Sequence, residues 1–207
     1  MSLLPDLQTT VNRLQLGFGV IPATRRTILN ELSNFVQAQL NSGKPVQLNF
    51  ICTHNSRRSH ISQIWAQAAA YYYDVKNVHT FSGGTGATSF NLRAVKAMRE
   101  AGFELEAENT NENAIYNVSF ADDVEAFQVF SKLYDDPANP KENFAAVMTC
   151  SDADENCPFI PGAEKRIALT YNDPKDFDNT AEEELKYRER VDEIGREILY
   201  AFSLIKK

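Results

Sequence analysis

One eight-residue segment restricts the fold of this chain more than any other feature. Residues 52–59 read Cys-Thr-His-Asn-Ser-Arg-Arg-Ser, which is a Cys-x5-Arg-Ser pattern. The apolar run Val46–Ile51 comes directly before it, and a stretch rich in alanine and aromatic residues, Ser59–Tyr73, follows. These runs predict a buried strand that enters the segment and a helix that leaves it. A loop between a strand and a helix can gather backbone N–H groups around an anion.

The rest of the chain repeats the same two elements. Strands are predicted at residues 46–51, 78–82, 144–149 and 166–171, and helices at residues 24–41, 59–73, 89–101 and 181–205. Strands that alternate with helices predict an α/β fold with a mainly parallel sheet. Residues 113–120 and 126–133 alternate like an antiparallel ribbon, and residues 1–22 are expected to be irregular. The side chains expected to face inward from the helices include Leu92, Val95, Met98 and Leu185.

The charge balance excludes some partners. The 207 residues include 28 acidic and 21 basic side chains, so the formal net charge is -7. An acidic chain repels phosphates, which argues against nucleic-acid and anionic-membrane binding and means that an anion must be held by a local cluster of donors. Since the chain has no 18-residue apolar run and no secretory signal, we expect no membrane span and a cytoplasmic location.

The Cys-x5-Arg-Ser segment has the chemistry of an oxyanion-binding nucleophile. Loop amides and the start of the following helix can hold a tetrahedral oxyanion, and the same field favours the thiolate of Cys52. Arg58 can bind two oxyanion oxygens at once. The residues expected around the oxyanion are Thr53, His54, Asn55, Ser56, Arg57, Arg58 and Ser59.

Four side chains of this segment have more specific expectations. Asn55 is expected to hold the shape of the loop through bonds to the backbone. Ser59 is expected to donate its hydroxyl to Cys52 and to cap the helix. His54 is expected to point to solvent, and Arg57 to be solvated or to steer anions.

The segment resembles the loop of the low-molecular-weight protein tyrosine phosphatase superfamily. The resemblance runs from about Val46 to the C-terminus and includes Phe81-Ser82-Gly83-Gly84 and Asp173-Pro174. It implies a three-layer sandwich with a central, mainly parallel four-stranded sheet flanked by helices. Residues 1–44 would then be an N-terminal helical extension, residues 45–207 the catalytic domain, and residues 113–140 an inserted β-ribbon. In that superfamily the aspartate before proline protonates the leaving group, which implies Asp173 as general acid; alone, Asp-Pro is typical of a turn.

The chain has three cysteines, Cys52, Cys150 and Cys157, and an odd number argues against a structural disulfide framework. The segment Cys150–Cys157, followed by Pro158, resembles the redox segment of the thioredoxin-coupled arsenate reductases, which share the phosphatase fold. The resemblance implies a relay in which Cys52 attacks arsenate, Cys150 attacks the adduct and Cys157 attacks Cys150. Thioredoxin would then reduce the last disulfide.

The spacing of the last two cysteines implies a structural change. Two residues seven apart in a helix lie about 10.5 Å apart along its axis. A disulfide requires Cα atoms within roughly 7 Å. A bond between Cys150 and Cys157 therefore requires the segment between them to unwind, and a short, polar, acidic segment has the low local stability that this needs.

Two other functions remain open at this stage. The chain could be a tyrosine phosphatase that hydrolyses phosphomonoesters through a phosphocysteine at Cys52, with Arg58 and Asp173. Lys175-Asp176 replaces the aromatic pair that often follows Asp-Pro in tyrosine phosphatases, which weakens this reading. It could instead be an oxyanion-binding redox sensor.

No cofactor and no metal site are predicted. The chain has no Cys-x2-Cys pair and no clustered histidines, which makes zinc a poor match. Some reductases bind potassium through a carboxylate in the helix after the loop, and the comparable position here is Gln63. The expected partners are arsenate or phosphate and thioredoxin.

Overall fold

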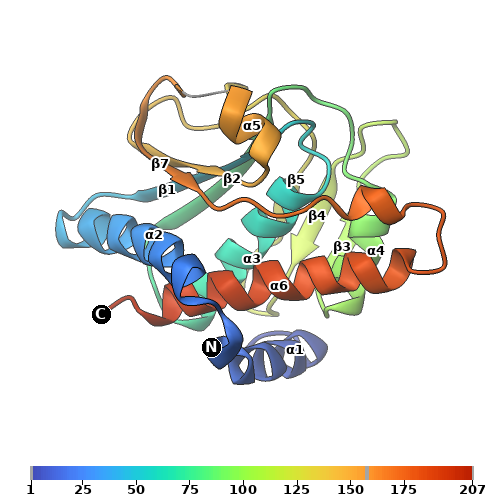
Figure 1. Ribbon diagram of the computed structural model, residues 1–207, viewed down its shortest axis with the longest axis horizontal. Coiled ribbons are helices and arrows are strands. Elements are labelled where there is room, and N and C mark those ends of the chain that lie inside the picture. Colours follow the sequence, from blue (N-terminus) through green and yellow to red (C-terminus); the bar gives the residue numbers. More distant parts are fainter. Residues whose placement is uncertain (1, 157–158, 207) are drawn as a thin grey trace.

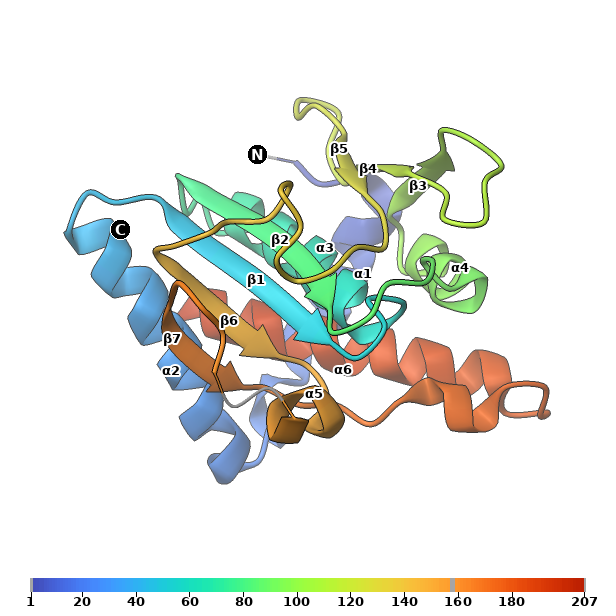
Figure 2. The same ribbon diagram turned by 90° about the horizontal axis from the view of Figure 1, so that it is seen from above.

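Four parallel strands form the central sheet of the computed structural model, which describes residues 2–156 and 159–206. The strands are β1 (Val46–Cys52), β2 (Val78–Gly84), β6 (Phe144–Met148) and β7 (Ala163–Ala168), in the order β2-β1-β6-β7. Each neighbouring pair runs parallel, so the carboxyl ends of all four strands lie at one edge of the sheet (Figure 2). The predicted parallel sheet is confirmed, and its carboxyl edge is where ligands bind in open α/β folds.

The two faces of the sheet pack against different layers because alternate side chains point in opposite directions. The helices are α1 (Pro5–Leu16), α2 (Ala23–Asn41), α3 (Arg58–Tyr72), α4 (Leu92–Glu100), α5 (Ser151–Asn156) and α6 (Glu183–Ser203). Phe50 and Val147 join the large hydrophobic core under α2, α3 and α6, whereas Ile51 and Met148 join a smaller core with Ala153 of α5 (Figure 1). None of the helices within the described ranges is both long and apolar enough to cross a membrane.

A second, three-stranded sheet lies beside α4. Its antiparallel order is β3-β4-β5, with bounds Glu104–Ala107, Tyr116–Ser119 and Phe127–Val129. The predicted ribbon is confirmed in β4 and β5, which lie inside the expected ranges. The sequence pattern missed β3 because Leu105 is its one buried side chain, too few to show an alternation.

The expectation that residues 1–22 are irregular is wrong. Pro5–Leu16 form α1, which packs against α6. Its buried residues Leu7, Val11 and Leu14 have helical spacing, and a proline in the first turn followed by Asp6 is typical of a helix start. These signals are present in the sequence, but the apolar pattern is too short to distinguish a helix from irregular chain.

Three further expectations need correction. Leu92 and Leu185 are 73% and 43% exposed, because each lies in the first turn of its helix, before the helix reaches the core. The last strand is Ala163–Ala168 rather than 166–171, because residues 169–173 leave the sheet as extended chain. That departure carries Tyr171 and Asp173 toward the loop after β1.

Gly195 of α6 marks the place where three helices meet. A Cβ atom there would lie 2.5 Å from Cε2 of Trp65 on α3 and 3.0 Å from Cδ1 of Leu14 on α1. Alanine normally stabilises an open helix position by about 1 kcal/mol relative to glycine. We expect Gly195→Ala to lower the free energy of unfolding by about 2 kcal/mol instead, because the fully buried Trp65 cannot move aside.

Urea denaturation measures this change. Gly19→Ala is the control, since nothing lies within 4 Å of a Cβ atom there, and it should change stability by less than about 0.5 kcal/mol. A Gly195→Ala protein as stable as the wild type would show that α1 and α3 do not close on α6 as the structure has them.

Candidate active site

The loop after β1 turns its carbonyl groups outward. Three of them accept hydrogen bonds from neighbouring segments: Thr53 O from Gly86 N at 2.7 Å, His54 O from the hydroxyls of Thr88 and Ser131 at 3.2 Å each, and Ser56 O from Asn91 N at 2.9 Å. A loop held in this way keeps its N–H groups for an anion at its centre. His54 itself is exposed, as expected.

Asn55 is the structural centre of the loop. It is fully buried with φ of 45°, and its side chain donates to Ser59 Oγ at 2.9 Å and accepts from Lys132 N at 2.8 Å. β2 approaches closely, since a Cβ atom at Gly84 would lie 2.7 Å from Asn55 N. The expected tie between Asn55 and the backbone is therefore present, and its partner comes from residue 132 of the long connection before β6.

The sulfur of Cys52 lies 3.1 Å from Ser59 Oγ. Because Ser59 Oγ already accepts from Asn55, its hydroxyl hydrogen is left for the sulfur. Ser59 does not cap α3, however. The capping position is Arg57, without a side-chain capping bond, and Ser59 lies inside the first turn.

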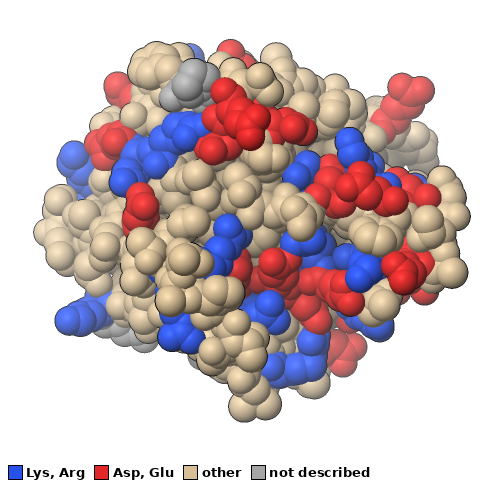
Figure 3. All heavy atoms as spheres, viewed as in Figure 1, with Lys and Arg blue, Asp and Glu red and all other residues tan. Residues whose placement is uncertain are grey.

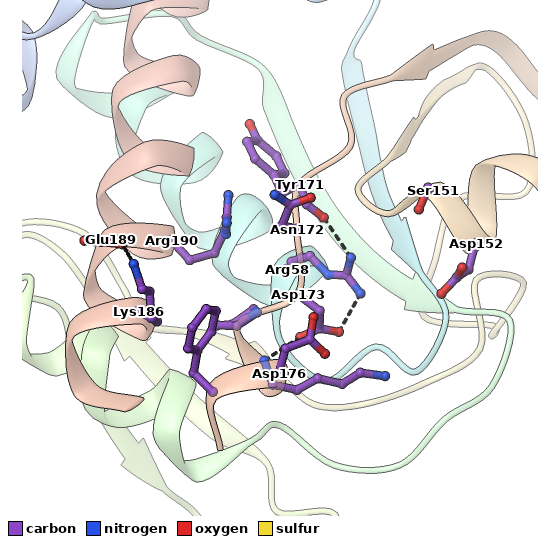
Figure 4. A pocket seen from close by; sticks show the side chains of 13 residues that line it. Arg58, Ser151, Asp152, Tyr171, Asn172, Asp173, Asp176, Lys186, Glu189 and Arg190 are labelled. Carbon is purple, nitrogen blue, oxygen red and sulfur yellow. Dashed lines mark hydrogen bonds and ion pairs between the residues drawn. The ribbon is translucent and has the colours of Figure 1, made fainter. Parts of the chain in front are cut away.

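Arg58 joins the loop to the chain that leaves β7. Its guanidinium donates to Tyr171 O at 2.8 Å and to Asp173 Oδ2 at 2.6 Å, and both contacts are visible in Figure 4. Arg58 Nε is buried and has no hydrogen-bond partner in the described part of the chain. The second oxygen of Asp173 accepts from Lys175 N at 3.1 Å, so Asp173 is held at the start of a short 3-10 turn, Pro174–Phe177. The structure thus brings the predicted Arg58 and Asp173 together.

Arg57 is largely buried, which corrects the first of its two expected roles, that of a solvated side chain. Its side chain is 16% exposed, and Nε donates to the hydroxyl of Tyr187 on α6 at 3.0 Å. Asp173 and Asp178 each lie 3.8 Å from its guanidinium. Burial and the hydrogen bond to Asp178 raise the pKa of Tyr187 well above its usual value, so the phenol stays neutral. Arg57 therefore anchors the loop to α6 through its side chain.

Cys150 lies at the same edge as the loop. It is fully buried, and its sulfur is 3.4 Å from the hydroxyl of Thr53, the residue next to Cys52. The sulfur also accepts the N–H of Ala153 in the first turn of α5 at 3.4 Å. These contacts hold the sulfur at the carboxyl edge of the sheet, next to the loop. Cys157 lies outside the described residues.

A cavity of about 590 Å³ opens beside Arg58 and Asp173. Figure 4 shows Arg58 at its inner wall between Tyr171 and Asp173, with Ser151 and Asp152 of α5 on one side. Its other walls are the turn after Asp173 and the α6 side chains Lys186, Glu189 and Arg190. Acidic side chains also gather over α5 nearby, as Figure 3 shows. The cavity therefore offers both signs of charge next to the loop.

Two buried titratable side chains lie behind the loop. His60 is fully buried against Phe90, with ring centroids 4.3 Å apart, and burial together with the charge of Lys132 lowers its pKa to about 3. Burial lowers the pKa of Lys132 to about 8, although Asp136 acts in the opposite direction. Only a contact with the backbone of Phe130 acts to raise this pKa, and burial outweighs it. His60 is therefore neutral near pH 7 in the folded protein.

Several contacts of this site had no signal in the sequence. Tyr171 contributes a backbone carbonyl, Tyr187 and Asp178 anchor Arg57, and Ser131 supports His54 from the inserted segment. None of these residues belongs to a motif, and their roles depend on the path of the chain. Among residues 2–156 and 159–206, no group of three or more His, Cys, Asp or Glu side chains could hold a metal ion.

The chain is similar to known proteins in sequence and in fold. No protein-family profile matches the chain. It is 33% identical to the arsenate reductase of Bacillus licheniformis over an aligned stretch of 150 residues. That stretch covers 72% of this chain and 89% of the relative. The arsenate reductase of Bacillus subtilis is 31% identical over a stretch of the same length. A solved low-molecular-weight phosphotyrosine phosphatase from Vibrio cholerae shares the fold, with a TM-score of 0.50, 12% identity and coverage of 76% of this chain and 94% of that chain.

His60 predicts how stability depends on pH. Its folded pKa of about 3 lies below the ordinary value of 6.5, so the unfolded chain binds more protons between these limits. Stability is therefore full above pH 6.5 and is lost as the pH falls below that value. From pH 7 to pH 5 this loss amounts to about 2 kcal/mol.

We expect His60→Phe, which keeps an aromatic ring against Phe90, to lose about 2 kcal/mol less than the wild type between pH 7 and pH 5. Urea unfolding at the two pH values measures the difference. The exposed His79 is the control, and His79→Gln should follow the wild type. Equal pH dependence of the His60→Phe and wild-type proteins would mean that His60 gains a proton without unfolding.

Proposed function

Since this chain belongs to the arsenate reductase family of the low-molecular-weight protein tyrosine phosphatase superfamily, we propose that it reduces arsenate to arsenite through Cys52, Cys150 and Cys157. We further propose that thioredoxin of the cytoplasm restores the thiols. The observation that carries the relay is the position of Cys150, whose buried sulfur contacts the residue next to Cys52. Ester hydrolysis has no use for a thiol there, whereas a relay requires one.

In the first step the loop holds arsenate, and the Cys52 thiolate attacks the arsenic. An S–As bond forms, and one arsenate oxygen is protonated and leaves as water. Asp173, whose carboxyl group contacts Arg58, is the proposed source of the proton. Asp173 accepts a hydrogen bond from the Arg58 guanidinium in the structure. We propose that arsenate takes over this contact and so frees Asp173 to act as the acid.

The second step moves two electrons to arsenic, and the third step moves the disulfide from Cys52 to Cys157. The Cys150 thiolate attacks the sulfur of Cys52, an S–S bond forms, and the S–As bond breaks with its electron pair on arsenic, which leaves as arsenite. Cys157 then attacks Cys150 and releases the Cys52 thiolate. The resulting Cys150–Cys157 disulfide is reduced by the dithiol of thioredoxin, which is oxidised in turn.

A second function, phosphomonoester hydrolysis, is favoured by one observation. The cavity of about 590 Å³ beside Arg58 and Asp173 exceeds what an arsenate ion fills, so an organic leaving group has room. Hydrolysis would use Cys52, Arg58 and Asp173 and leave the other two cysteines idle. The two activities therefore separate by their dependence on Cys150 and Cys157.

The relay predicts a trapped intermediate. With arsenate and no thioredoxin, Cys157→Ser should stop after one turnover with Cys52 bonded to Cys150, because no thiol remains to resolve that bond. The wild type should instead carry Cys150–Cys157. Peptide mapping without reductant distinguishes the two states, and Cys52→Ser should form neither. Arsenate reduction by Cys150→Ser and Cys157→Ser at the wild-type rate would rule out the relay, and the chain would then use an external thiol.

The proposed acid gives a separate prediction. Asp173→Asn should slow hydrolysis of aryl phosphates with poor leaving groups by about 100-fold, and those with good leaving groups much less, since only the former need a proton. Asp176→Asn is the matched control, because Asp176 lines the same cavity without a bond to Arg58. Rates for a series of aryl phosphates measure this. Equal slowing across the series would make Asp173 structural.

A further inference from the structure

We propose that Arg25, in the first turn of α2, is a positioning residue for the oxyanion site: it fixes Tyr171, whose carbonyl orients the guanidinium of Arg58. The inference rests on the proposed role of Arg58 in oxyanion binding. It would make the N-terminal helices part of the site, although they lie before the Cys-x5-Arg loop in the chain and contribute nothing to it directly.

The first link is a buried ion pair between α2 and α6. Nε of Arg25 lies 2.9 Å from each carboxylate oxygen of Glu197. The two side chains are only 17% and 5% exposed. A planar guanidinium held by both oxygens of a buried carboxylate has little freedom to move.

The second link is the ring of Tyr171. The guanidinium carbon of Arg25 lies 4.6 Å from the ring centroid, which is stacking distance. Tyr171 is 5% exposed, and burial followed by the charge of Glu197 raises the pKa of its phenol well above the usual value, so the ring stays neutral. Arg25 and Glu197 together therefore fix one residue of the chain that leaves β7.

The third link is the backbone of Tyr171. Residues 169–173 belong to no helix or strand, so their path depends on side-chain packing and on isolated bonds such as Tyr171 N to Thr149 O at 3.1 Å. The carbonyl of Tyr171 accepts from Arg58 at 2.8 Å. A shift of this segment would move that acceptor and Asp173 together, and with them both observed partners of the Arg58 fork.

The chain supplies a matched comparison. Arg13 of α1 likewise contacts a carboxylate on α6, here with two nitrogens, at 2.6 and 2.9 Å from Asp192. Its side chain is 54% exposed. Both arginines tie an N-terminal helix to α6, but the stacking contact with Tyr171 belongs to Arg25. Loss of helix docking alone should therefore affect both variants, whereas loss of positioning should affect Arg25 variants specifically.

The test measures how tightly inorganic phosphate binds, from its protection of Cys52 against iodoacetamide. Arg25→Ala should raise the phosphate dissociation constant about tenfold, since misplacement by about 1 Å is enough for such a loss. Arg25→Lys should give a smaller rise, because an ammonium cannot both stack and bind two oxygens. Arg13→Ala should stay within about twofold of the wild type. Thermal unfolding shows whether each variant is folded, and Arg25→Lys serves if Arg25→Ala is not.

Coupling to Tyr171 completes the test. Arg25→Ala combined with Tyr171→Leu should bind phosphate no more weakly than the weaker-binding single variant, because both act through one carbonyl. Additive losses, or Arg25 variants that match Arg13→Ala, would overturn the inference. Arg58→Lys distinguishes failure of the proposed function from failure of the role given to Arg25. Normal phosphate binding by Arg58→Lys would contradict the oxyanion site on which the proposed function depends. Weak binding by Arg58→Lys with normal binding by the Arg25 variants would contradict only the positioning role of Arg25.

Discussion

Hydrogen bonds that hold the carbonyls of Thr53, His54 and Ser56 outward are the constraint on which the site depends. Their donors come from residues 85–91, after β2, and from Ser131 in the long connection before β6. β1 and β2 are parallel neighbours, so the chain after each strand starts at the same edge of the sheet, and the connection before β6 reaches that edge through its pairing of Leu133 with Gly84. The fold therefore builds a cradle of N–H groups in an acidic chain that would otherwise repel an anion.

The same edge brings a second thiol to the cradle. Cys150 follows β6, the neighbour of β1, so the parallel pairing itself places it beside Thr53. The helix that follows, Ser151–Asn156, has only six residues and one buried side chain, Ala153. Few packing contacts oppose its opening, which the proposed disulfide between Cys150 and Cys157 would need. The weak packing of α5 is thus consistent with the proposed redox step, because that step needs a helix that opens at low cost in free energy.

The sheet and the loop could be predicted from the sequence, whereas the long-range contacts of the site could not, for physical reasons. The sheet followed from continuous apolar runs such as Phe144–Met148, and the loop from a motif whose residues are close in the chain. The contact of Arg58 with Tyr171 joins residues 113 positions apart, and nothing local marks a backbone carbonyl as an acceptor. The partner of Arg57 is the hydroxyl of Tyr187, and the sequence pattern places Tyr187 on an apolar helix face. The pattern therefore offers Arg57 no polar partner and predicts a solvated side chain. Contacts that depend on the folded path leave no pattern in the sequence.

Turnover with thioredoxin tests the central claim most directly. Wild-type protein, thioredoxin, thioredoxin reductase and NADPH are mixed, and NADPH consumption is followed with and without arsenate. The account predicts many turnovers that require both arsenate and thioredoxin, at a rate above the hydrolysis of an aryl phosphate by the same preparation. Rapid ester hydrolysis without arsenate-dependent NADPH consumption would contradict it and would assign the site to phosphoester chemistry.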